Sequence, residues 1–125
     1  MESSYSIEPA ENLVRMQVTG EVTLESLKSL INQVGKDPHY HPGMHAIADL
    51  RHSHGQWDYS EIQRFRDYLA HIAQQRQCRW AALVKPGAVV AIGYVVILIS
   101  EGVGIQMRMF EDPHQALHWI RGETD

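Results

Sequence analysis

Histidines are the residues of this sequence with the most evident capacity for chemistry. Eight are present; His39, His41 and His45 lie within seven residues, and His52 and His54 would point the same way on an extended chain. Neutral imidazole is a common metal ligand. Their spacing matches no established zinc signature, and no Glu-x-x-His or His-x-x-x-His helix accompanies the cluster. We therefore predict no metal site and no cofactor, and interpret these histidines as polar loop residues.

Nucleophilic catalysis has little support in the sequence. Cys78 is the only thiol and stands where a predicted helix gives way to a predicted strand, without a glycine-rich elbow, and no Gly-x-Ser-x-Gly motif occurs. These patterns predict a protein that is not an enzyme. The alternative is a small hydrolase or metal-dependent enzyme that uses His52, His54 and nearby acids, a hypothesis motivated by histidine density alone.

Composition and charge narrow the classes of partner. The formal net charge is -4, and no cluster of Lys and Arg exceeds two or three residues, which argues against binding to nucleic acid. A chain of 125 residues predicts one domain, residues 1–125. A single cysteine and a start that lacks the basic and apolar regions of a secretory signal predict a cytoplasmic protein.

The first half of the chain predicts a hairpin, a helix and a strand. Apolar residues alternate with polar ones before Pro9 and again from Leu13 to Thr19, as in two strands with one wet face. Thr23 can cap a helix whose apolar residues recur at helical spacing until Gly35. His45 to Leu50 then has the short apolar character of a buried parallel strand.

The second half continues the alternation of helix and strand. After an irregular loop from Arg51 to Asp58, Ser60 with Gln63 forms a capping-box signature and opens a helix to about Gln77. Trp80 to Val84 and Ile105 to Phe110 predict strands, and Asp112 followed by Pro113 starts a last helix. This order predicts an α/β fold: a mixed, mostly parallel five-stranded sheet with an N-terminal β-hairpin and about four helices.

The segment from Ala88 to Ile99 carries no charged residue, and glycines at both ends favour a helix. It is apolar on nearly every helical face, so one sheet would leave apolar side chains uncovered. Twelve residues of helix rise only about 18 Å, too little to span a bilayer. Four covers stay open: neighbouring helices of the same chain, a second subunit, an apolar or lipid-like ligand, or shallow contact with a membrane. The predicted ligand or partner surface comprises Val89, Ile92, Tyr94, Val96 and Ile99.

A second candidate site follows from sheet geometry. In an open α/β sheet, ligands bind beyond the carboxyl ends of the strands. There we predict a pocket rim in which Arg51 and Lys85 could attract an anion, while Trp57 and Tyr59 supply an apolar wall. Ordinary loop and capping roles are the alternative for all four residues.

Four short motifs, in this order along the chain, resemble the SpoIIAA-like proteins, which are related to STAS domains and distantly to CRAL-TRIO lipid carriers: Gly20-Glu21-Val22-Thr23, Asp37-Pro38-His39-Tyr40, Ala48-Asp49-Leu50-Arg51 and Phe110 to Ile120. The resemblance spans nearly the whole chain. It implies a non-enzymatic regulatory or ligand-binding domain, with membrane association suggested for this branch. It also implies a phosphorylated serine at the start of the helix that follows the third strand, where Ser53 and Ser60 stand without the usual Asp-Ser-x-Gly context.

The sequence thus predicts a non-catalytic binding or regulatory module. Its expected partner is an apolar or amphiphilic ligand, a membrane surface that it touches peripherally, or a protein, which includes a second copy in a homodimer. No nucleic acid is expected.

Overall fold

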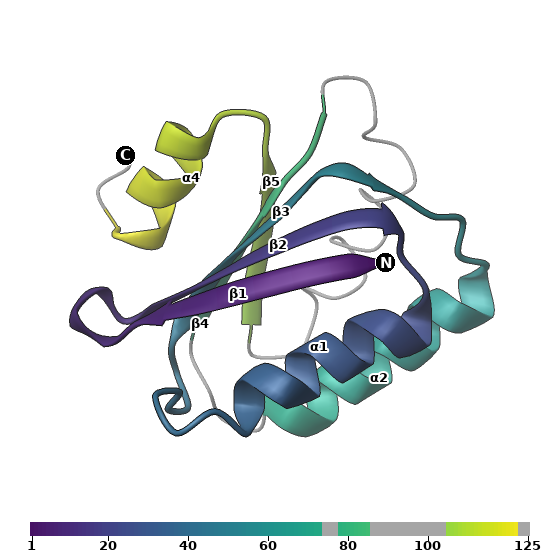
Figure 1. Cartoon of the computed structure of the whole chain (residues 1–125), viewed down its shortest axis with the longest axis horizontal. Helices are drawn as coiled ribbons and strands as arrows, with labels where there is room; N and C mark the ends of the chain where they lie inside the picture. The colour runs from purple at the N-terminus through teal and green to yellow at the C-terminus, as the bar shows by residue number, and fades with distance from the viewer. Residues whose placement is uncertain (74–77, 86–104, 123–125) are drawn as a thin grey trace.

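The computed structural model describes residues 1–73, 78–85 and 105–122. This part of the chain contains five strands, three α-helices and one short 3-10 helix, in the order β1 Glu2–Glu8, η1 Pro9–Glu11, β2 Leu13–Glu21, α1 Leu24–Gly35, β3 His45–His54, α2 Tyr59–Ala73, β4 Cys78–Leu83, β5 Ile105–Phe110 and α4 Pro113–Ile120 (Figure 1). The predicted fourth helix, Ala88 to Ile99, lies outside the described residues.

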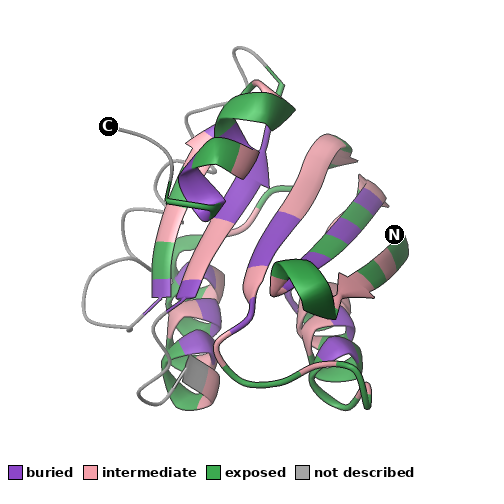
Figure 2. Cartoon of the chain, turned by 90° about the vertical axis from the view of Figure 1, so that its left-hand side faces the viewer, coloured by how far each residue is buried: buried purple, intermediate pink, exposed green. Residues whose placement is uncertain are grey.

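The five strands form one sheet in the order β1-β2-β3-β4-β5. The first two strands pair antiparallel, with Tyr5 opposite Met16, and all later pairs are parallel. The predicted hairpin and the mixed, mostly parallel sheet are therefore confirmed. From Val14 to Val18 in β2, buried residues alternate with exposed ones, as the sequence alternation requires (Figure 2).

Two helix starts match the predictions. Thr23 accepts a hydrogen bond from the backbone N–H of Ser26, and the Ser26 side chain accepts one from the Thr23 N–H, which completes a capping box for α1. Asp112 accepts from the N–H of His114 and is followed by Pro113 at the first position of α4. Side chains thus satisfy backbone donors that a helix start leaves unpaired.

The predicted start of α2 was wrong by two residues. Asp58 accepts a hydrogen bond from the Glu61 N–H at 2.8 Å, and Glu61 accepts one from the Asp58 N–H at 3.3 Å. The capping box is therefore Asp58 with Glu61, and Ser60 lies inside the first turn of the helix rather than at its cap.

The loop predicted from Arg51 to Asp58 is shorter than expected, because β3 continues to His54. The strand is extended past an irregularity in its pairing with β2, after which Gly20 lies opposite Ser53. Gly55 then turns the chain against Val22: a Cβ atom at Gly55 would come within 2.6 Å of the Val22 carbonyl oxygen. Only glycine allows this approach without displacing the backbone.

The helices cover opposite faces of the sheet. Helix α4 packs on one face, whereas α1 and α2 lie side by side on the other (Figure 1). The α4 face buries one compact cluster: Leu13, Ile47, Ala81, Leu83, Phe110, Ala116, Trp119 and Ile120. None of the described helices has the length and apolar character needed to cross a membrane.

Candidate ligand-binding cavity

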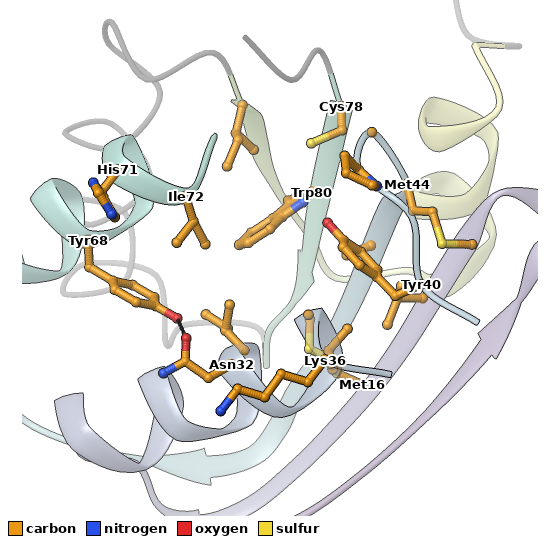
Figure 3. A pocket seen from close by; sticks show the side chains of 18 residues that line it. Met16, Asn32, Lys36, Tyr40, Met44, Tyr68, His71, Ile72, Cys78 and Trp80 are labelled. Atoms are coloured by element: carbon orange, nitrogen blue, oxygen red, sulfur yellow. Dashed lines mark hydrogen bonds between the residues drawn. The ribbon is translucent and has the colours of Figure 1, made fainter. Parts of the chain in front are cut away.

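A cavity of about 830 Å³ lies between the sheet and the helices α1 and α2 (Figure 3). Side chains from β2, β3, β4 and β5 form its sheet wall, and the far walls come from both helices and from the segment that joins α1 to β3. Cα separations of 8 Å or less recur between α4 and each of β3, β4 and β5, whereas they are sparse between the described residues of α1 or α2 and any strand. The two helices therefore stand further from the sheet than α4 does.

The sheet wall is apolar, and several of its side chains are small. Trp80 is flanked across the parallel pairing by Ala46, and the next pair on the same face, Ala48 with Ala82, lines the adjoining smaller cavity. Alanine at three of these four positions leaves space that larger residues would fill. The apolar lining comprises Val14, Met16, Ile31, Val34, Pro42, Met44, Ala46, Ile72, Cys78, Trp80 and Ile105.

The polar lining groups come from the helices and the connecting segment. Tyr68 of α2 donates a hydrogen bond to the Asn32 side chain of α1, so this pair bridges the two helices beside the cavity (Figure 3). Burial raises the pKa of the Tyr68 hydroxyl above its ordinary value, which keeps it a neutral donor. Lys36, Tyr40 and His71 complete the polar lining.

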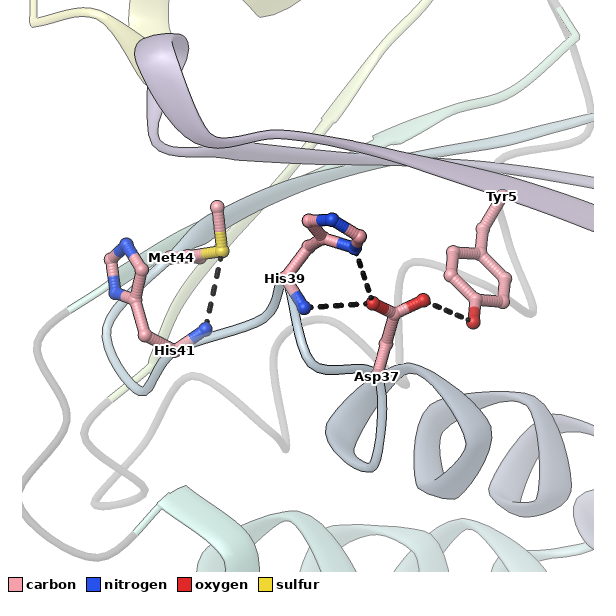
Figure 4. A network of polar contacts seen from close by, with 5 residues as sticks. All are labelled: Tyr5, Asp37, His39, His41 and Met44. Atoms are coloured by element: carbon pink, nitrogen blue, oxygen red, sulfur yellow. Dashed lines mark hydrogen bonds and ion pairs between the residues drawn. The ribbon is translucent and has the colours of Figure 1, made fainter.

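The segment from Lys36 to Met44 forms one wall of the cavity, and the hairpin holds it in place. The Tyr5 hydroxyl donates to Asp37 at 2.9 Å, and Asp37 also accepts from the His39 backbone N–H at 2.9 Å (Figure 4). The His39 N–H and then the Tyr5 hydroxyl hold the pKa of Asp37 below its usual value. Met44 is buried at the cavity wall, and its sulfur accepts from the His41 N–H.

A smaller cavity of about 170 Å³ adjoins the first toward the carboxyl ends of the strands. The two share lining from Met16, Ile31, Ala46 and Trp80. Its lining is mostly apolar and includes Trp57, whose indole N–H donates to the Val22 carbonyl at 3.0 Å and whose ring meets Phe65 edge-on.

The four residues predicted to rim a pocket lie in different environments, and their joint role as a rim stays a prediction. The Trp57 side chain lines the smaller cavity. Arg51 makes a bidentate contact with Asp49, at 2.9 and 2.8 Å, and this contact holds the pKa of the Asp49 carboxyl below its usual value. Tyr59 is 65% exposed on the first turn of α2, and Lys85 is exposed beyond β4. An anion site at Arg51 would compete with Asp49 for the same guanidinium.

The two serines considered for phosphorylation differ in environment. Ser53 is half-buried, and its hydroxyl donates to the Leu50 carbonyl at 2.7 Å. Ser60 is exposed in the first turn of α2, where a helix N-terminus favours negative charge. Phosphorylation of either stays a prediction. The predicted surface formed by Val89, Ile92, Tyr94, Val96 and Ile99 lies outside the described residues.

The histidines are dispersed over the described part of the chain. No group of three or more His, Cys, Asp or Glu residues there could hold a metal ion. His39 contacts Asp37, His45 accepts a hydrogen bond from the Arg79 N–H, and His52 and His54 are exposed on β3. Helix α4 carries one His-x-x-x-His pair that was not predicted. Its members, His114 and His118, are both exposed.

The search of solved structures finds the same architecture elsewhere. A crystal structure of a protein of the DUF3478 family from Shewanella loihica, described as having a SpoIIAA-like fold, matches with a TM-score of 0.62 over 94% of this chain and 93% of that chain. This chain has a SpoIIAA-like fold. The identity between the two sequences is 15%, so the likeness is one of fold alone. Neither the scan against protein-family models nor the search of curated proteins gives a match.

The SpoIIAA-like fold confirms the architecture expected from the resemblance. The cavity residues themselves were not predicted as a site. The signal for them was present in the alternating strand positions Ala46, Ala48 and Ala82, which point small side chains toward the helices.

Proposed function

We propose that this chain is a non-catalytic binding module that takes an apolar or amphiphilic ligand into the cavity between its sheet and the helices α1 and α2. The observation that carries the proposal is a volume of about 830 Å³ with a mostly apolar lining. Pockets for small ligands occupy roughly 300–1,000 Å³ and combine an apolar wall with a few polar groups. A packing defect would be smaller, since native cores hold few voids larger than a water molecule.

The predicted apolar surface on Ala88 to Ile99 is a separate route to a partner. It stays a prediction that a second subunit, a lipid-like ligand or a membrane interface buries this surface. Light scattering during size-exclusion chromatography measures self-association directly, and Val96→Asp is expected to weaken a dimer that uses this surface. The proposal of a ligand in the cavity does not depend on what buries this surface.

Filling the cavity tests the proposal. Ala46 is buried and lines both cavities, so Ala46→Leu places three more carbon atoms in the empty volume. We expect the affinity for N-phenyl-1-naphthylamine, a neutral apolar fluorescent probe, to fall about tenfold, or about 1.4 kcal/mol. The free energy of unfolding should stay the same or rise by about 1 kcal/mol because more apolar surface is buried.

Ala116→Leu is the matched control. Ala116 is 0% exposed within the compact cluster under α4, so the same added atoms should destabilise the protein by about 1–3 kcal/mol. Probe binding should be unchanged in the folded variant. A probe that fails to bind the unaltered protein, or an Ala46→Leu variant as destabilised as the control, would refute the cavity proposal.

A further inference from the structure

The larger cavity has basic residues and no acidic ones among its described lining. Among its described lining residues, Lys36 and His71 are basic and no residue is Asp or Glu. This contrasts with the chain as a whole, whose formal net charge is -4. The described lining is therefore more basic than the chain as a whole.

The basic groups stand where the cavity meets solvent. Lys36 follows the last turn of α1, His71 lies in the last turn of α2, and both are exposed, as is Asn32 between them in the lining. The residues of the sheet wall, such as Ala46 and Ile105, are buried. Figure 3 shows Lys36 and His71 at the margin of the space and the Trp80 ring within it. The cavity thus has a basic mouth and an apolar interior.

Two acidic groups stand close in sequence to Lys36 and His71, and neither of them lines the cavity. Asp37 follows Lys36 directly, but its carboxylate is held by Tyr5 and by His39 on the side of the hairpin (Figure 4). Asp67 precedes Tyr68 and lies 4.0 Å from the guanidinium of Arg66. The carbonyl end of α1 does place partial negative charge near Lys36, although the Lys36 N–H itself bonds to carbonyls of that last turn. A full positive charge on Lys36 outweighs this partial charge.

We infer that the ligand class is an amphiphile with an acyl chain and an anionic head, with the chain against Trp80 and Ile105 and the head between Lys36 and His71. The inference rests on the proposed function and adds the sign of the charge on the ligand's head group and the position of that group in the cavity. A free single-chain carboxylate and an anionic phospholipid share this chemistry. Both would leave the head in the exposed mouth, where its charge stays hydrated.

Three amphiphiles with the same tail and different heads test the inference by isothermal titration calorimetry below micelle formation: decanoate, decyltrimethylammonium and decanoyl-N-methylglucamide. Decanoate is expected to bind about tenfold more tightly than the cation. Lys36→Gln and His71→Gln should each weaken decanoate about two- to fivefold, the range for exposed ion pairs, and leave the neutral amphiphile unchanged. The loss should shrink at high salt.

Arg64→Gln is the control, because Arg64 is an exposed cation of α2 outside the cavity lining. Equal binding of the three heads, or equal losses in Lys36→Gln and Arg64→Gln, would overturn the inference while the cavity proposal stands. Failure of every amphiphile and of the neutral probe would instead remove the cavity proposal. Co-sedimentation with phosphatidylcholine vesicles, with and without phosphatidylglycerol, separates the sources: binding that depends on both Lys36 and phosphatidylglycerol identifies the phospholipid.

Discussion

The His45 ring extends the sheet by one hydrogen bond. Its Nδ1 atom accepts the Arg79 backbone N–H at 2.9 Å, one residue before the first pair of β3 and β4, Ala46 with Trp80. An acceptor nitrogen carries no proton, so the bond requires a neutral ring with its proton on Nε2. Burial, and then the charge of Arg79, lower the pKa of His45 below 6.5. The sequence predicted His45 at the start of a buried strand but indicated no hydrogen-bonding role for its ring.

The His45 contact should make stability depend on pH. Between the ordinary value of 6.5 and the lower pKa of the folded state, the unfolded chain binds more protons than the folded one. Stability is therefore fully present above pH 6.5 and decreases as the pH falls through the folded pKa. His45→Ala should remove this dependence and cost about 1 kcal/mol at pH 7.5, because the Arg79 N–H loses its acceptor.

Urea unfolding between pH 5 and 7.5 measures both effects. His114→Ala, at an exposed position of α4, is the control and should keep the slope of the unaltered protein. If His45→Ala kept that slope as well, the neutral-ring assignment would be wrong.

At the scale of elements, two helix starts follow from the local sequence and one depends on tertiary contacts. Thr23 and Asp112 cap where the sequence predicts, but both Asp58 and Ser60 have an acidic or amide residue three positions on and fit the same signature. The choice follows from Trp57, whose contacts with Val22 and Phe65 fix where the chain enters α2. The contact with Val22 joins residues 35 positions apart, so no local pattern could decide between the two caps.

The capping assignment predicts unequal effects for two neighbouring substitutions. Asp58→Ala should lower the free energy of unfolding by about 1 kcal/mol, because the Glu61 N–H at the start of α2 loses its side-chain acceptor. Ser60→Ala should stay within about 0.5 kcal/mol. Urea titrations of both variants under one condition are sufficient, and a larger loss for Ser60→Ala would restore the capping box predicted from the sequence.

At the scale of the whole molecule, the two faces of the sheet are packed differently. The α4 face is a compact cluster in which Arg79 also lies over the Trp119 ring, while the face under α1 and α2 encloses both cavities. Atoms that border empty space lack contact partners on one side. Side chains of the same type should therefore contribute unequally to stability on the two faces.

Two buried leucines test this difference. Leu13, 1% exposed, belongs to the compact cluster, and Leu30, 3% exposed, lines the smaller cavity. Leu13→Ala should cost about 4–5 kcal/mol and Leu30→Ala about 2–3 kcal/mol, the upper and lower parts of the range for buried leucine. Calorimetric unfolding of both variants measures the difference. Equal costs would mean that the α1 and α2 face is packed as tightly as the other.

Periodicity in the sequence was enough to predict the N-terminal hairpin and most helix and strand bounds, because each depends on neighbours within a few residues. The alternation of strands and helices then predicted the α/β class and the parallel pairing, because such crossovers are right-handed. The SpoIIAA-like fold was expected from the resemblance of four short motifs and of the order of elements. The cavity, the Asp58 cap and the Asp49 contact of Arg51 were not predicted. The cavity depends on how far α1 and α2 stand from the sheet, and the Asp58 cap depends on how Trp57 is held. Both are set by contacts between distant parts of the chain.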